Sequence, residues 1–138
     1  MISFARMSRA GTASLLVIAI ALPLCPARAD DGFPFGAEMQ LDMDRQRGSK
    51  RIPNLEIGDA GEVTLELWCK GGKGQFSVAG NTVIFVPGAM ENRPCPPDRA
   101  QQDDELIAAL AATATWRRQG DFVSFIGTKT LNFRINTN

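Results

Sequence analysis

Apolar side chains alternate with polar ones in several short runs of this chain, and this period of two constrains the fold most. In the clearest run, residues 62–68, Val63, Leu65 and Leu67 occupy alternate positions. Alternate residues of a β-strand point to opposite sides of the sheet, so one face can be buried while the other stays in water. The pattern therefore predicts a sheet with one apolar face.

Other β-forming runs flank this segment. They cover residues 39–43, 75–79, 82–86, 113–118, 122–126 and 131–135. Gly80-Asn81 separates two of them and predicts a tight hairpin, and the short links between the last three predict a meander. Residues 70–74 are rich in glycine and break the alternation. They are interpreted as a turn, with a backbone cradle for an anion as the alternative.

One segment has a helical period instead. Leu106, Ile107 and Leu110 recur at i, i+1 and i+4 among alanines. We expect Asp103 or a neighbour to cap this helix, and the acids at 103–105 to interact with the free N–H groups of its first turn. A metal or glycosidase site is the alternative, but it would need a second carboxylate that the sequence does not place.

The segment from Pro87 to Pro97 is rich in proline and is predicted to be a long surface connection, because proline disrupts helices and interior strands. Strands, one helix and further strands follow one another in the chain. This order predicts an α+β fold, a small antiparallel and barrel-like sheet with one helix packed on it. Residues 30–61 are expected to form one domain with residues 62–138.

Residues 1–29 have the features of a secretory signal peptide. Arg6 and Arg9 precede an apolar core, and small residues lead to a cleavage position after Ala29. The core is too short for a stable membrane span. A periplasmic or secreted protein is therefore expected, and a lipid anchor on Cys25 is the alternative.

Cleavage would leave two cysteines, Cys69 and Cys95, which predict one disulfide in an oxidising compartment. Two buried thiols or a redox pair are the alternatives. The chain has no histidine, which excludes serine triads, Cys–His dyads and His-ligated zinc. Its 15 basic residues balance its 15 acidic residues, which disfavours nucleic acid as a partner. No catalytic residue, cofactor or metal site is predicted.

Several residues are candidates for binding a partner. They are Trp68, Arg93, Pro94, Arg99 and Trp116. Tryptophan and arginine often anchor protein interfaces, although packing in or beside the core is the simpler interpretation for both tryptophans. The bases of residues 45–51 are interpreted as a solvated loop face, with a patch for an acidic partner as the alternative. Met39, Met43 and Met90 are interpreted as core residues rather than copper ligands.

Several segments, in this order, resemble the META domain of the HslJ type. They are residues 82–90, Cys95 in its proline-rich surroundings, residues 104–110, residues 120–127 and residues 131–133. The resemblance runs from about Glu62 to Arg134 and suggests a divergent member. It implies a small antiparallel sheet wrapped with a helix and a role in the envelope or in stress, such as motility or drug tolerance. It implies no catalytic residues.

The expected function is that of a non-enzymatic, monomeric binding module for an unknown envelope protein or another envelope component. A secreted inhibitor of lysozyme or of a protease is the alternative, acting through the loop from Pro87 to Pro97, which proline and Cys95 would hold rigid. An enzyme that uses only carboxylates or lysine in a cleft is a third hypothesis.

Overall fold

Eight antiparallel strands and one helix make up residues 32–137, which are the residues that the computed structural model describes. The elements in chain order are β1 (Glu38–Leu41), β2 (Asn54–Ile57), β3 (Glu62–Glu66), β4 (Gly71–Ala79), β5 (Thr82–Glu91), α1 (Pro97–Ala111), β6 (Thr115–Gln119), β7 (Phe122–Ile126) and β8 (Thr130–Ile135). The predicted signal peptide and Cys25 lie outside the described residues. No helix within them is long and apolar enough to cross a membrane.

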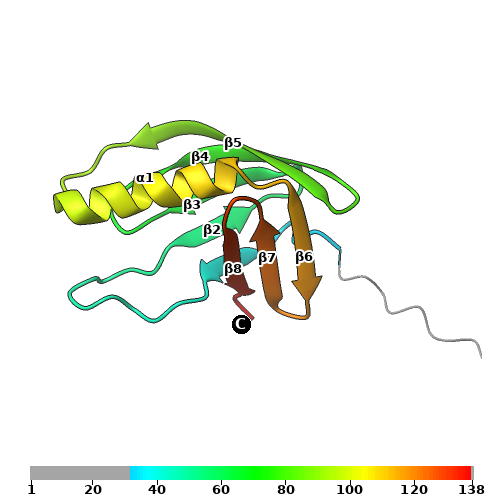
Figure 1. Cartoon of the computed structure of the whole chain (residues 1–138), viewed down its shortest axis with the longest axis horizontal. Coiled ribbons are helices and arrows are strands. Elements are labelled where there is room, and N and C mark those ends of the chain that lie inside the picture. The colour runs from blue at the N-terminus through cyan, green and yellow to red at the C-terminus, as the bar shows by residue number, and fades with distance from the viewer. Residues whose placement is uncertain (1–31, 138) are drawn as a thin grey trace, which may run out of the picture.

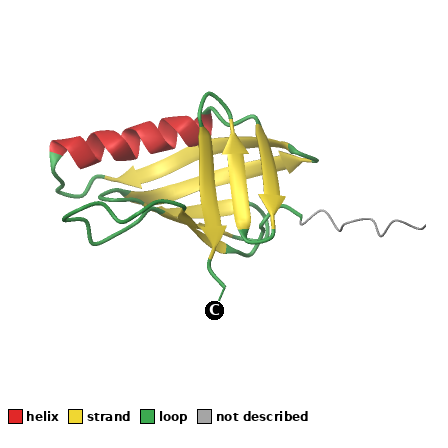
Figure 2. Cartoon of the chain, turned by 60° about the horizontal axis from the view of Figure 1, so that its bottom comes forward, coloured by secondary structure: helices red, strands yellow, loops and turns green. Residues whose placement is uncertain are grey.

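The strands close into a ring, because each pairs with the next in the chain and β8 pairs with β1. Figure 1 shows α1 lying along β4 and β5, and Figure 2 shows β6, β7 and β8 crossing the direction of those longer strands. Between β5 and β6 the register consists of Thr82 opposite Thr115. This arrangement confirms the predicted α+β fold, an antiparallel sheet with one helix packed on it.

The core contains the apolar face that the period of two predicted. Val63 and Leu65 of β3 are at most 1% exposed, whereas the glutamates at both ends of that strand face solvent. Phe76 and Phe125 stack with their ring centroids 5.2 Å apart. Leu110 of α1 belongs to the same core, so the helix closes the apolar interior as an amphipathic helix should. Each such side chain stabilises the fold by about 1.5–3 kcal/mol when it leaves water.

The connections between the later strands agree with the predicted turns. Ala79 pairs with Thr82 across a hairpin in which Gly80 has a φ of +59° and Asn81 has a negative φ. A positive φ at the first central residue alone is typical of a type II′ turn, in which glycine carries no steric cost. Strands β6, β7 and β8 form the predicted meander.

The prediction of a turn at residues 70–74 is wrong. The turn spans residues 67–70, where the Leu67 N–H donates to the Lys70 carbonyl at 2.8 Å, and β4 begins at Gly71. The glycines of β4 serve close packing instead. A Cβ atom at Gly72 would lie 2.2 Å from Met90 Sδ and 2.7 Å from the Ala89 carbonyl oxygen, so only glycine allows β5 to approach this closely.

The prediction that the whole segment from Pro87 to Pro97 is a surface connection is also wrong. Strand β5 continues to Glu91 and α1 begins at Pro97, which leaves only residues 92–96 irregular. Pro87 is tolerated because the register of β5 with β6 is confined to Thr82, so within the described residues this edge of β5 is unpaired at Pro87. Proline, which lacks an N–H group, fits at such a free edge. Pro97 fits because the first residue of a helix needs no N–H.

The helix begins earlier than predicted, so the interpretation of residues 103–105 as its first turn is wrong. Pro96 is the N-cap residue and makes no side-chain capping bond, and Asp98 is the acid of the first turn. Asp103 lies in the middle of α1 and is fully buried. A buried carboxylate needs partners, and those partners connect the helix to a distant turn.

Candidate functional site

The carboxylate of Asp103 holds the turn at residues 67–70 against α1. Its Oδ1 accepts the Trp68 N–H at 3.0 Å, and its Oδ2 accepts the N–H groups of Cys69 at 2.9 Å and Lys70 at 2.8 Å. Three backbone donors satisfy the buried charge, which explains why an acid occupies a core position. The turn is therefore fixed from within the fold.

The predicted disulfide between Cys69 and Cys95 is present, and the residues of the pair are 26 positions apart in the chain. It joins the same turn to residues 92–96, the segment that leads into α1. This segment is therefore bonded covalently to the turn, and it continues directly from β5 on one side and into α1 on the other.

The loop between β1 and β2, residues 42–53, is the third segment of the site, beside the turn at residues 67–70 and residues 92–96. Most of it is exposed, as predicted, but its middle is attached to the helix. Gln46 donates to the Gln102 side chain at 2.9 Å, and Arg99 Nη2 donates to the Arg47 carbonyl at 3.3 Å. Ser49 is buried, and its hydroxyl donates to the Arg51 carbonyl at 2.8 Å.

These three segments meet at a groove of about 350 Å³, which we call the basic groove. It is lined by Gly48, Lys50, Arg51, Trp68, Cys69, Arg93, Pro94, Pro96 and Arg99. Four of the five candidate partner-binding residues thus come together. The fifth, Trp116, lines a separate hollow of about 600 Å³ beside Gly80, whose carbonyl accepts its Nε1 hydrogen at 2.8 Å.

The two tryptophans pack at the edge of the core, as the simpler interpretation predicted. Phe33 lies edge-on to Trp116, with ring centroids 5.2 Å apart. Trp68 is half-buried and lines the basic groove. Its Nε1 is buried and has no hydrogen-bond partner among residues 32–137. The ring of Trp68, rather than its N–H group, is therefore what the groove offers to a ligand.

The cations of the basic groove outnumber the carboxylates that neutralise them. Glu66 accepts from Arg93 Nη1 at 2.9 Å and from Arg51 Nη1 at 3.2 Å, and Glu91 accepts from Arg93 Nη2 at 3.1 Å. Lys50 has no side-chain partner in the described part of the chain, and Arg99 binds only a carbonyl. Positive charge therefore remains for a ligand.

Arg93 also affects the ionisation of Glu66. Its hydrogen bond to Glu66, with a smaller contribution from the charge of Arg51, holds the pKa of that carboxyl below its ordinary value of 4.5, against the opposing effect of partial desolvation. Glu66 is therefore ionised at neutral pH and remains available to orient both arginines.

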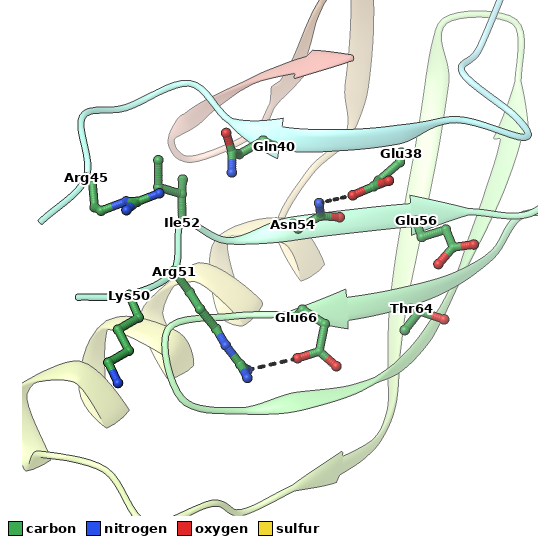
Figure 3. A pocket seen from close by; sticks show the side chains of 10 residues that line it. All are labelled: Glu38, Gln40, Arg45, Lys50, Arg51, Ile52, Asn54, Glu56, Thr64 and Glu66. Atoms are coloured by element: carbon green, nitrogen blue, oxygen red, sulfur yellow. Dashed lines mark hydrogen bonds and ion pairs between the residues drawn. The ribbon is translucent and has the colours of Figure 1, made fainter. Parts of the chain in front are cut away.

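A second groove, of about 390 Å³, crosses the outer face of β1, β2 and β3 (Figure 3), and we call it the polar groove. It is lined by Glu38, Gln40, Arg45, Lys50, Arg51, Ile52, Asn54, Glu56, Thr64 and Glu66. It shares Lys50 and Arg51 with the basic groove, so the two are contiguous.

Sequence reasoning missed Gln40, Glu56 and Glu66. Their only signal was that they occupy outward positions of alternating runs. The strand register is what places them together, since Gln40 lies opposite Asn54, and Asn54 lies opposite Glu66.

The chemistry available in both grooves is that of charge pairing and hydrogen bonding. Within the described residues, no three side chains of the His, Cys, Asp and Glu types are grouped so that they could hold a metal ion.

Solved structures support the fold. A crystal structure of a DUF4847 family protein from Bacteroides vulgatus ATCC 8482 matches 62% of this chain with a TM-score of 0.51 and 15% identity, and the match spans 60% of that protein's length. A structure determined by NMR matches 72% of this chain and 89% of its own, with a TM-score of 0.55 and 11% identity. At these identities the likeness concerns the fold alone.

Among curated proteins, none matches this sequence significantly. The META domain family matches residues 38–134, and this range contains all eight strands and α1 apart from the last residue of β8. It extends the resemblance from Glu62 back through β1 and β2. Because the match covers more than half of the chain, the protein belongs to the META domain family.

Proposed function

We propose that this protein is a non-enzymatic binding domain that works outside the cytoplasm and uses the basic groove to bind an acidic part of an envelope component. The features of residues 1–29 support export, and a disulfide suits an oxidising compartment. The groove supports binding because it brings together residues that are far apart in the chain and leaves cations without carboxylate partners.

The single observation that carries the proposal is the convergence of Lys50, Arg51, Arg93 and Arg99 beside Trp68. Each cation comes from a segment that is fixed in the fold by the contacts of Asp103, by the disulfide or by the contacts of the loop at residues 42–53. Fixed groups lose little conformational entropy when a ligand binds, so such a groove is pre-organised. Arginine and tryptophan are also the side chains that most often dominate interface energies.

The non-enzymatic part of the proposal draws support from Glu66, which lies where the two grooves meet. A general acid requires a carboxyl whose pKa is raised toward neutrality. The pKa of Glu66 is lowered instead, because Arg93 and Arg51 bind its charged form.

The inhibitor hypothesis now concerns a shorter segment, residues 92–96. Within it, Arg93 is bound to both Glu66 and Glu91, which favours a role in the groove wall over insertion into an active site. An inhibition panel of lysozyme and proteases at micromolar protein is the test of this alternative, and no inhibition would remove it.

Capture from periplasmic extract tests the proposed function. The double variant Lys50→Glu/Arg99→Gln should lose most of a reproducible partner that the unchanged protein captures, and added salt should have the same effect because both act on charge pairing. Arg117→Gln/Lys129→Glu is the matched control, since it makes the same two types of substitution, with the same change in net charge, at positions outside the basic groove. Equal capture by both double variants would contradict the proposal, provided urea unfolding shows both folded.

A further inference from the structure

The basic groove does not end at Arg51 but continues as the polar groove across β1, β2 and β3. Both are open at the surface, and together they form a continuous track. A compact anion would occupy only the basic end. The shape therefore suits an elongated ligand.

Charge is segregated along this track. Figure 3 shows Arg45, Lys50 and Arg51 at one end, and Glu56 toward the other. Register explains the order, because Glu38 lies opposite Glu56 on one cross-strand row and Gln40 lies opposite Asn54 on another. The cations precede β2 in the chain and so lie beyond the Asn54 end of that strand.

The charged side chains of the polar groove that have no partner among the described residues follow the same order, with cations at one end and a carboxylate at the other. Among residues 32–137, the side chains of Arg45, Lys50 and Glu56 take part in no hydrogen bond or ion pair. By contrast, Glu66 is bound to two arginines, and Glu38 accepts from Asn54. Two cations at one end and one carboxylate at the other are therefore the charges that a ligand could pair.

We infer that the track binds an extended peptide segment of a partner protein, with acidic side chains at the Lys50 end and a lysine or arginine at the Glu56 end. This inference rests on the proposed function and deepens it by naming the ligand class. Extended peptide suits the track because its backbone amides match the side-chain amide of Gln40, a half-buried residue that lines the polar groove. Its apolar side chains can pack on Trp68 and Pro94, which line the basic groove.

The length of the ligand follows from the chain itself. Lys50 and Glu56 are six residues apart, which corresponds to at most about 20 Å of extended chain. The acidic and basic residues of the peptide should therefore be separated by about four residues.

The test uses three labelled synthetic peptides with blocked ends, measured by fluorescence anisotropy at low ionic strength on the full mature chain. The bipolar peptide is Asp-Asp-Ser-Gly-Ser-Gly-Lys-Lys, and the mixed peptide, Asp-Lys-Ser-Gly-Ser-Gly-Lys-Asp, has the same composition without segregation. The acidic peptide replaces both lysines with aspartates. We expect the bipolar peptide to bind about three- to fivefold more tightly than the mixed one, the scale of one or two exposed ion pairs.

Two variants locate the effect. Glu56→Gln should abolish the preference for the bipolar peptide and leave the affinity for the acidic peptide equal or higher, because a repulsive charge is removed. Lys50→Gln should weaken the binding of the bipolar and the acidic peptide. Lys129→Gln, which lies outside the track, should weaken the binding of neither.

The outcomes separate the two claims. Equal binding of bipolar and mixed peptides, or no effect of Glu56→Gln, overturns the bipolar ligand, while a loss with Lys50→Gln would still support the basic groove. No binding of any peptide also overturns the bipolar ligand, and together with capture that does not depend on Lys50 and Arg99 it overturns both claims.

Discussion

The buried carboxylate of Asp103, in the middle of α1, accepts the backbone N–H of Lys70 at 2.8 Å, although the two residues are 33 positions apart. The same carboxylate accepts two more N–H groups from the turn, those of Trp68 and Cys69. The side chains of Lys70 and Asp104 form an ion pair on the outside of this contact. The helix and the turn that carries the disulfide are therefore one unit, and the wall of the basic groove depends on it.

Replacing Asp103 should destabilise the protein strongly. In Asp103→Ala, three backbone donors lose a charged acceptor inside the fold, and each buried unsatisfied group costs about 1–3 kcal/mol. We expect a loss of at least about 3 kcal/mol in the free energy of unfolding, measured by urea denaturation. Asp104→Ala is the neighbouring control and should cost less, about 1 kcal/mol, because it removes one ion pair whose carboxylate is 63% exposed. Similar losses for the two variants would contradict this role of Asp103.

Adding one methyl group at Gly72 should also destabilise the fold. The new Cβ would lie 2.7 Å from the Ala89 carbonyl oxygen, so β4 and β5 would have to separate. Overpacking of this kind costs about 1–3 kcal/mol, which the urea midpoint of Gly72→Ala would report. Gly32→Ala is the control, because a Cβ there meets nothing within 4 Å. A Gly72→Ala protein as stable as the control would contradict the role of Gly72 in the close packing of β4 on β5.

Removing the disulfide should lower stability without abolishing the fold. The bond closes a loop of 26 positions, which corresponds to about 3.5 kcal/mol in the chain-entropy account. The double variant Cys69→Ser/Cys95→Ser should lose about that amount yet retain the turn, because Asp103 still binds its N–H groups. Reductant should destabilise the unchanged protein to the same level and leave the variant unaffected. An effect of reductant on the variant would contradict this interpretation.

The ionisation of Glu66 should depend on Arg93. Because the folded-state pKa of Glu66 is lowered, its ion pairs stabilise the fold fully above pH 4.5, and this contribution is lost as the pH falls through the lowered value. Arg93→Gln should raise the pKa of Glu66 toward 4.5 without fully restoring it, since Arg51 remains. Carbon-13 NMR titration of the Glu66 carboxyl measures this, and Arg117→Gln should leave it unchanged. High salt should reduce the difference, because these groups are exposed.

Local patterns sufficed where structure depends on near neighbours. The alternation at residues 62–66 identified β3 and its buried face, and the Gly80-Asn81 pair identified a hairpin, because both signals lie within one element. They failed where a distant segment decides. The glycines of residues 71–74 have the composition of a turn, but β5 packs against them in the fold. Asp103 has the residue type of a helix cap, but in the fold it accepts three N–H groups from the turn at residues 67–70.

The candidate site shows the same division. The sequence alone contained Trp68, Arg93 and Arg99 as candidates, but no local pattern connects them with Lys50 or Glu66. They meet because the ring closes and the helix packs on it, which brings residues from 48 to 99 to one groove. Composition and the hydrophobic periods of the sequence determined an α+β domain that has a disulfide and no histidine for catalysis or metal binding. The tertiary structure alone decided which charges face one another, because Coulomb forces and hydrogen bonds depend on distance in space and not along the chain.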